Sequence, residues 1–554
     1  MNVAAAERFI TPPELWEGYD PNKGEFKEEI NKEETNNGIY YKESYISAYV
    51  LDQEIRVFCR YSVKEGAKNA PGLLDVHGWY GAPRILKDYV QDGWAVLAHD
   101  YAGKLNNKNY TKYPEKLTHA NMKKKPVWTK YSDGGLITDP KETSDYIWYA
   151  LQRRAISFLL TQKEVDPKRI GARGFSYGGT TMWNLGMDPR VKAIVAYFGI
   201  GWSTYYRGSR VWKYNNPYVE PEKTPGEKIF LASIAPQAHA PYITAATLWL
   251  NGSNDHHGGH ERGPDSFKMF KEGIPWDYAV QARAHHSTDK LGDNCKLWLE
   301  KHVLGKNHFW PKRPQSKLIL GDDGVPEIHI TPASPKRIKK IQVYICLKTQ
   351  DNIERNWRDV KSVRKGNVWV SKLPVINVHD YAFSYSNIRY DNNVVVSSDF
   401  EAAIPASLGK AVATEKKTNI LPEGVGQWIL VAPAEGPKSI KGFRPTHNRF
   451  GTENTQFADP KYAAPKGSKL NFMFYCTQPQ QITLSVNKWF TINIDITASD
   501  GWQAKTLTID QLKLKHDGRT LNDWSEVKKI GIKSQEGSDI SKVVFARFKW
   551  LSPE

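Results

Sequence analysis

The segment from Arg169 to Thr180 contains the pattern Gly-x-Ser-x-Gly, with Ser176 between Gly174 and Gly178. A predicted strand precedes this pattern and a predicted helix follows it, so the serine falls on a tight turn. Such a turn pushes the hydroxyl outward, and the glycines let neighbouring elements approach without a clash from a Cβ atom. The positive end of the following helix points at the reacting centre. The pattern predicts that Ser176 is a nucleophile; the alternative is a structural glycine-rich turn.

A serine is a weak nucleophile unless a base and an orienting acid activate it. On strand-to-helix turns of this kind the partners follow in the chain order serine, acid, histidine. Asp255 comes shortly after a predicted strand at 247–250, at the sheet edge where ligands bind, and we expect it to be the acid. The alternatives are a solvated turn or a metal site with His256 and His257. Adjacent histidines point apart and zinc needs further ligands, so we predict no metal.

The base is expected in the pair His285–His286, which follows the last predicted strand of this region. We select His286 as the base because it precedes a small polar residue at the start of a loop. His285 stays open as the alternative. The histidine that is not the base is predicted to contact substrate or to pack beside the site.

Two backbone amides must stabilise the negative charge that develops on the substrate oxygen. The amide of Tyr177, directly after the nucleophile, is one predicted donor. The other is the amide of Trp79, in the loop Asp75–Tyr80 after an early strand, where a His-Gly pair lets the chain turn inward. Tyr80 is expected to line the substrate pocket. The alternative is that these aromatic side chains are ordinary cover.

The elements that position these residues alternate between strands and helices from about 46 to 312. Short apolar runs at 73–76 and 95–98 are typical of strands buried on both faces. Between the early strands and the nucleophile, apolar residues recur at the spacing of one helix face: Ile147, Leu151, Ala155 and Leu159. This alternation predicts a mainly parallel α/β sheet with helices on both faces.

After about residue 312 the apolar residues alternate with polar ones, as in 341–345, 470–474 and 490–496. Many short strands without long helices indicate β-sandwiches. We therefore predict four parts: an N-terminal extension over 1–45, the α/β domain over 46–312, an immunoglobulin-like sandwich over 313–410 and a jelly-roll-like sandwich over 411–554.

The 554 residues carry 77 Lys+Arg and 60 Asp+Glu, a net charge of +17. The excess is spread along the chain, which favours solubility or attraction to a polyanion such as an acidic polysaccharide. No nucleic-acid-binding motif is present, so we expect no nucleic-acid partner. No apolar run is long enough to span a membrane. The four cysteines are far apart and indicate neither a disulfide scaffold nor a zinc site.

The first residues, Met1–Glu7, show no basic segment followed by an apolar stretch, so no signal peptide is visible. We nevertheless expect a periplasmic or secreted protein, from which any signal peptide has been removed. The sequence does not indicate the oligomeric state.

On these motifs the region 46–312 resembles the α/β-hydrolase superfamily. The stretch Glu164–Gly179 is similar to bacterial acetyl xylan esterases and to dienelactone-hydrolase-like or prolyl-oligopeptidase-like members. The resemblance implies a Ser-His-Asp triad at Ser176, Asp255 and one histidine of the 285–286 pair, with no metal and no organic cofactor. Dienelactone hydrolases proper use a cysteine nucleophile, from which this chain departs.

The C-terminal region resembles immunoglobulin-like and carbohydrate-binding jelly-roll modules, on the stretches Trp524–Ile532 and Val543–Trp550. Together with the triad, this similarity favours a serine esterase that removes acetyl groups from a carbohydrate. One alternative is a prolyl-type or X-prolyl serine peptidase, and another is a non-catalytic glycan-binding protein.

Overall fold

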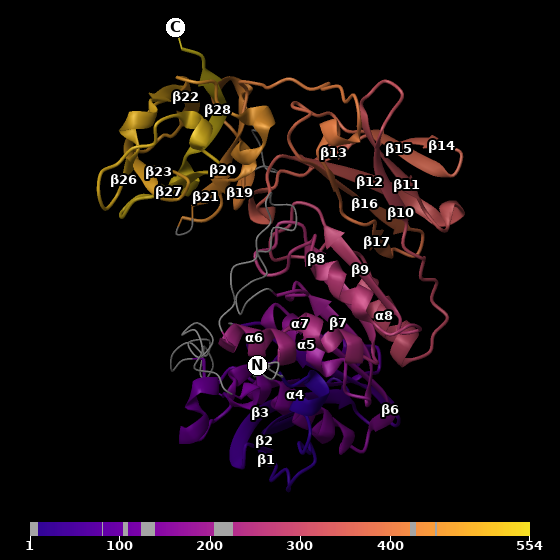
Figure 1. Ribbon diagram of the computed structural model, residues 1–554. Coiled ribbons are helices and arrows are strands. Elements are labelled where there is room, and N and C mark those ends of the chain that lie inside the picture. Colours follow the sequence, from indigo (N-terminus) through magenta and orange to yellow (C-terminus); the bar gives the residue numbers. More distant parts are fainter. Residues whose placement is uncertain are drawn as a thin grey trace, which may run out of the picture. The chain divides into compact units, whose positions relative to one another are not determined.

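The computed structural model divides into two compact units (Figure 1). The described residues are 9–79, 81–103, 109–122, 139–203, 225–421, 428–448 and 451–553. Unit 1 comprises Met1–Pro314, Pro332–Ile341 and Asn387–Ser398. Unit 2 comprises Gln315–Thr331, Gln342–Ser386 and Asp399–Glu554. Each unit is described by itself below.

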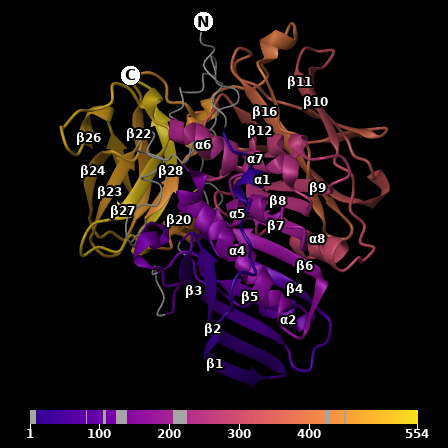
Figure 2. The same ribbon diagram turned by 60° about the horizontal axis from the view of Figure 1, so that its bottom comes forward.

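Unit 1 is built on a sheet whose described strands follow the order β1-β2-β3-β5-β4-β6-β7-β8-β9 (Figure 2). The strands are β1 (Glu29–Asn36), β2 (Ile39–Val50), β3 (Gln53–Lys64), β4 (Ala70–Val76), β5 (Ala95–His99), β6 (Val165–Phe175), β7 (Val191–Tyr197), β8 (Ala246–Gly252) and β9 (Trp276–Gln281). The first three strands and β5 pair antiparallel. From β5 to β9 every pair is parallel, which confirms the predicted mainly parallel sheet.

Helices cover both faces of this sheet. They are α1 (Pro12–Leu15), α2 (Lys87–Gln91), α4 (Ser144–Leu160), α5 (Tyr177–Leu185), α6 (Pro225–Ser233), α7 (Pro236–His239) and α8 (Asn294–Val303). A Cβ atom at Gly72 of β4 would touch Leu159 of α4, whereas one at Gly171 of β6 would touch Leu299 of α8. Gly171 of β6 is in register with Leu73 of β4, so these two positions face the same side of the sheet. Gly72, next to Leu73, faces the other side, and the contacts with α4 and α8 therefore lie on opposite faces.

The edges of the sheet go beyond what the sequence pattern suggested. β1 and β2 extend the antiparallel side, and the expected boundary at residue 45 falls within β2. At the other edge, the segment 387–398 lies beside β9. The side chain of Asn387 donates to the carbonyl of Val280 at 2.8 Å, and the Val280 amide donates to the hydroxyl of Ser397 at 2.8 Å. These hydrogen bonds satisfy backbone groups at the edge of β9 that could otherwise pair with another strand.

Unit 2 contributes most of four antiparallel sheets. Two of them follow the orders β10-β11-β15-β14 and β13-β12-β16-β17, and β18 also pairs with β16. Their strands are β10 (Gln315–Leu320), β11 (Pro326–Thr331), β12 (Ile338–Leu347), β13 (Arg358–Val360), β14 (Val363–Lys365), β15 (Val368–Lys372), β16 (Ala382–Tyr390), β17 (Val395–Ser397) and β18 (Glu401–Ala403).

The other two sheets follow the orders β19-β20-β28-β22-β25 and β21-β27-β23-β24-β26. Their strands are β19 (Val431–Glu435), β20 (Lys441–Pro445), β21 (Thr452–Asn454), β22 (Lys469–Tyr475), β23 (Gln480–Val486), β24 (Phe490–Ile496), β25 (Gln503–Leu507), β26 (Lys513–Leu514), β27 (Ile530–Ser534) and β28 (Val544–Leu551). One apolar core joins the two sheets and includes Phe472, Leu484 and Phe545. The chain is thus an α/β-hydrolase fold followed by β-sandwich modules.

Two tryptophans in the stretches that carry the resemblance to sugar-binding modules are core residues. Trp524 and Trp550 are almost fully buried, and their rings lie 5.3 Å apart between centroids. A sandwich core of this size needs large side chains, and this need alone explains the aromatic residues in these stretches. A sugar ligand is not required to explain them.

All four cysteines lie among the described residues, where they are buried and not joined in disulfides. None of the described helices combines the length and the apolar character needed to cross a membrane.

Candidate active site

Ser176 is the single residue between the end of β6 and the start of α5. Its backbone has φ 55° and ψ −120°, a region that residues other than glycine rarely adopt. Such a conformation costs about 1–3 kcal/mol and persists only where the surroundings impose it. Here the Ser176 amide donates to the carbonyl of Tyr197 at 2.9 Å, and its carbonyl accepts from the Thr180 amide at 3.0 Å. The turn therefore has the strained backbone geometry that the sequence pattern predicts for Ser176.

The two flanking glycines are required by close backbone approach. A Cβ atom at Gly174 would lie 2.2 Å from the carbonyl oxygen of Gly178. A Cβ atom at Gly178 would lie 2.4 Å from the carbonyl oxygen of His77 and 2.5 Å from that of Val76. Because all the opposing atoms belong to the backbone, they cannot rotate away. The glycines of the pattern Gly-x-Ser-x-Gly thus allow the turn at Ser176 to pack closely against the loop that follows β4.

We expect Gly178→Ala to lower the free energy of unfolding by about 1–3 kcal/mol, because its methyl group overpacks two backbone oxygens. Intrinsic propensity acts in the opposite direction, since alanine favours a helix over glycine by about 1 kcal/mol. Urea unfolding measures the net effect. Gly501→Ala is the control, because a Cβ atom there meets nothing within 4 Å. Equal stability of the two variants would contradict the clash.

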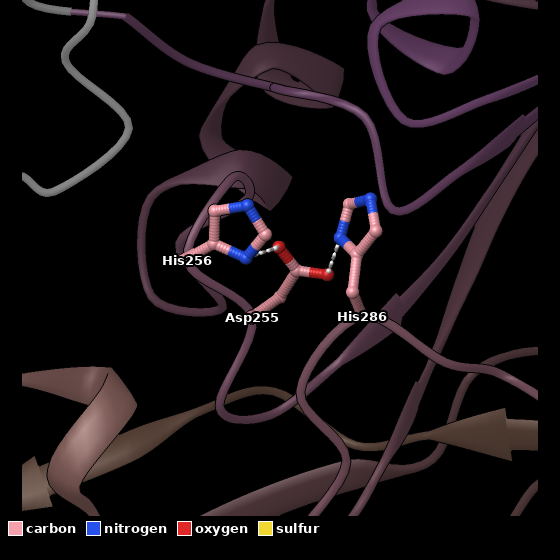
Figure 3. Close-up of side chains that lie close together, drawn as sticks. All are labelled: Asp255, His256 and His286. Carbon is pink, nitrogen blue, oxygen red and sulfur yellow. Dashed lines mark hydrogen bonds and ion pairs between the residues drawn. The ribbon is translucent and has the colours of Figure 1, made fainter. Parts of the chain in front are cut away.

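Asp255 and His286 form a hydrogen-bonded pair (Figure 3). Asp255 lies just beyond β8 and His286 just beyond β9, so both follow the carboxyl ends of neighbouring parallel strands. The Nδ1 atom of His286 is 2.8 Å from Oδ2 of Asp255. The carboxylate is fully buried, whereas the imidazole is 29% exposed. The sheet thus brings together two of the residues predicted from their order in the chain, and it pairs His286 with Asp255; the role of His286 as the base stays a prediction.

The second carboxylate oxygen is held by the backbone. Oδ1 of Asp255 accepts from the amide of His257 at 2.6 Å and from that of Gly258 at 3.3 Å. One oxygen therefore anchors the acid, and the other is left to orient the imidazole. This arrangement fixes the Nδ1–H tautomer of His286, with a free lone pair on Nε2, which is the form that a general base requires.

The ring of Phe198 contacts Phe175, the residue before Ser176, and also His286. Its centroid is 4.2 Å from that of His286, and the neighbouring Tyr197 carbonyl accepts the Ser176 amide. Within the described part of the chain, however, the Ser176 hydroxyl makes no hydrogen bond to His286. Contacts between catalytic groups often tighten only when substrate binds. The link from Ser176 to His286 stays a prediction.

The loop after β4 lies against Ser176. A Cβ atom at Gly78 would be 3.0 Å from Cβ of Ser176, which places the predicted oxyanion loop beside the hydroxyl. The ring of Trp79 packs on the ring of Tyr177 with 4.9 Å between centroids. The two amides predicted as oxyanion donors therefore belong to residues in contact, although their role stays a prediction. Tyr80 lies outside the described residues.

His285 is partly exposed, and its main chain packs closely on β8. A Cβ atom at Gly252 would lie 2.2 Å from the carbonyl oxygen of His285. This contact fixes the backbone that leads into His286. A role of the His285 side chain in substrate binding stays a prediction.

Sequence reasoning missed two residues that anchor the loop predicted to hold the oxyanion. Nε2 of His77 is 3.2 Å from Oδ1 of Asp100, and the Tyr101 hydroxyl donates to the His77 carbonyl at 3.1 Å. Asp100 also accepts from the amides of Gly103 and Thr111. Asp100 follows β5 directly, and a polar residue at the end of a buried strand is a signal that could have identified it.

The metal alternative at 255–257 involves a different set of residues from the one considered in the sequence. Asp255 has His256 and His286 near it, and one ligand atom from each of the three lies within 4.8 Å of the others. His257 points elsewhere, with Nδ1 3.2 Å from the carbonyl of Phe198, and burial lowers its pKa to about 4. His257 is therefore neutral near pH 7 and adds no charge beside His286.

Residues 152–302 match the model of the prolyl oligopeptidase family. No curated protein matches the chain. Among solved structures, the acetyl xylan esterase from Paenibacillus sp. R4 is 20% identical with a TM-score of 0.37, over 48% of this chain and 85% of that one. Acetyl xylan esterase 1 from Thermoanaerobacterium sp. JW/SL YS485 is 17% identical with a TM-score of 0.35, over 50% and 90%.

The acylaminoacyl peptidase from Pyrococcus horikoshii is 15% identical with a TM-score of 0.30, over 48% of this chain and 46% of that one. The match over residues 152–302 agrees with the strand order, which gives unit 1 the α/β-hydrolase fold. The structures similar to this chain include both esterases and a peptidase.

Proposed function

We propose that the protein is a serine carboxylic-ester hydrolase that removes acyl groups, acetyl above all, from a carbohydrate. The observation that carries the proposal is the 2.8 Å bond between Asp255 and His286, on the same sheet edge as the strained turn of Ser176. An oriented imidazole beside a serine on such a turn is the arrangement that activates a hydroxyl for acyl transfer.

In the proposed reaction, Oγ of Ser176 attacks the ester carbonyl while Nε2 of His286 takes the hydroxyl proton. Asp255 holds the imidazole and stabilises its transient positive charge. The amides of Tyr177 and Trp79 stabilise the oxyanion. The imidazolium then gives its proton to the leaving sugar oxygen. Water, deprotonated by His286, attacks the acyl-enzyme, and acid and free serine are released.

The carbohydrate part of the proposal is supported by the β-sandwich modules that follow the hydrolase. The net charge of +17 favours an acidic polysaccharide as the target, because opposite charge raises the rate of encounter. Such a substrate agrees with the proposed periplasmic or secreted location. No organic cofactor or resident metal ion takes part in this mechanism.

A second candidate function is peptide hydrolysis, which the match to the prolyl oligopeptidase family favours. The discriminating experiment compares p-nitrophenyl acetate with prolyl and aminoacyl nitroanilides. Acetic acid released from acetylated xylan and from acetylated acidic glycans then tests the carbohydrate. We expect turnover of the acetyl esters and none of the nitroanilides.

The reverse result would replace the esterase by a peptidase. A fluorophosphonate probe separates both enzymes from a non-catalytic glycan-binding protein. We expect the probe to label Ser176 covalently, because it reacts only with an activated serine. Glycan binding without labelling and without turnover would overturn both enzymatic proposals.

A further inference from the structure

The buried carboxylate of Asp255 has an imidazole near each of its oxygens (Figure 3). His286 lies on one side, with Nδ1 2.8 Å from Oδ2, and His256 lies on the other, with Nδ1 3.9 Å from Oδ1. The two rings are 4.8 Å apart between centroids. The proposed mechanism uses Asp255 and His286 but gives no role to His256.

We propose that Asp255, His256 and His286 bind a divalent transition-metal ion such as Zn²⁺, and that the ion reversibly blocks the hydrolase. The inhibitory part of this inference rests on the proposed function, whereas the binding part does not. Two imidazoles and one carboxylate form a usual zinc donor set, and water would fill the fourth position. The ion is an inhibitor here and not a cofactor.

The donor atoms lie close enough together for a small adjustment to bring them around such an ion. Around a tetrahedral zinc with bonds of about 2.0–2.1 Å, the ligand atoms lie about 3.3 Å from one another. His286 Nδ1 lies 2.8 Å from Oδ2 of Asp255 and His256 Nδ1 lies 3.9 Å from Oδ1, and one ligand atom from each of the three residues lies within 4.8 Å of the others. His256 is 57% exposed, so a small rotation of its side chain can close the remaining gap without disturbing the core.

The chemical consequence follows from the tautomer of His286. In the free site, Nδ1 carries the single ring proton and donates it to Asp255, which leaves the lone pair of Nε2 for the serine proton. A metal ion takes the lone pair of Nδ1, so the ring proton moves through water to Nε2. The ring stays neutral and the proton count is unchanged. Nε2 then has no lone pair to accept the proton of Ser176.

The binding experiment measures the affinity for Zn²⁺ by competition with a chromophoric chelator in a non-coordinating buffer. We expect one site in the wild type and in Ser176→Ala, which removes the nucleophile but leaves all three ligands. We expect His256→Ala to bind at least tenfold more weakly. His516→Ala is the matched control, because His516 is 73% exposed with a carboxylate of Asp517 at 3.5 Å, in unit 2.

Two results would overturn the site. One is equal affinity of the wild type and His256→Ala. The other is an equal loss of affinity in His516→Ala, which would mean adventitious binding by exposed histidines.

The activity experiment measures ester hydrolysis with increasing Zn²⁺ and then with added EDTA. We expect Zn²⁺ to lower kcat with little change in KM, and EDTA to restore the rate. His256→Ala should keep the metal-free rate and need at least tenfold more Zn²⁺ for half inhibition. Binding without inhibition would overturn the inhibitory role. A protein that hydrolyses no substrate would overturn the proposed function, while the binding comparison would still decide whether the site exists.

Discussion

Ser176→Ala is expected to lower kcat for p-nitrophenyl acetate by about 10⁴- to 10⁶-fold, the loss usual when a catalytic serine is removed. Alanine has no hydroxyl, so no acyl-enzyme can form. His286 and the oxyanion donors would remain and could assist only a slow attack by water. Release of nitrophenol under saturating substrate measures kcat, and the fluorophosphonate probe should no longer label the protein.

Ser287→Ala is the control for this variant. Ser287 lies directly after His286 and is partly exposed, and its hydroxyl contacts Asp289 at 2.7 Å. Substitutions of this kind usually change energies by less than about 0.5 kcal/mol, which corresponds to a rate change of about twofold. If Ser176→Ala kept full activity while remaining folded, the nucleophile would have to be sought elsewhere.

Asp255→Asn is expected to lower kcat by about 10³- to 10⁴-fold with little change in KM. The reason lies in the two amides, of His257 and Gly258, that donate to Oδ1. In the variant, the amide oxygen of the asparagine must take this position, because it is the acceptor. Its NH₂ group then faces Nδ1 of His286 and donates to it. Nδ1 becomes an acceptor, the ring proton sits on Nε2, and the base is lost.

The pH dependence of kcat and thermal unfolding together test this explanation. Because the asparagine keeps the two backbone hydrogen bonds, the variant should unfold close to the wild-type temperature. Asp289→Asn is the control, since Asp289 is an exposed carboxylate close in sequence to His286. Hydrogen bonds from Gln281 and Ser287 lower the pKa of Asp289. Loss of activity in both variants, or in neither, would contradict the proposed role of Asp255.

Asp255→Asn and bound Zn²⁺ are expected to act on the His286 imidazole in the same way. In both cases the lone pair of His286 Nδ1 is engaged, by an asparagine NH₂ or by a metal ion, and the ring proton is forced onto Nε2. A wild-type enzyme saturated with Zn²⁺ is therefore expected to resemble Asp255→Asn in having a reduced kcat and an unchanged KM. EDTA should restore activity only to the metal-loaded enzyme.

Features that depend on local chain chemistry could be predicted from the sequence. The turn at Ser176 is one, because the sterics of Gly-x-Ser-x-Gly involve residues close together in the chain. The parallel strands and the helix α4 are others, because the spacing of apolar residues reports which face is buried. The chain order serine, acid, histidine led to the prediction of Asp255 and the 285–286 pair. This prediction was possible because parallel strands bring their carboxyl ends to one edge of the sheet.

Only the tertiary structure decided which histidine pairs with Asp255 and which neighbour, His256 or His257, joins the same carboxylate. The side chains of adjacent loop residues point in directions that depend on the backbone angles of the loop. Long-range packing sets those angles, so they cannot be read from the spacing of residues in the sequence. The same holds for the anchoring of His77 by Asp100, and for the extension of the sheet by β1 and β2. These features depend on contacts between distant parts of the chain, whose energies appear only when the core is formed.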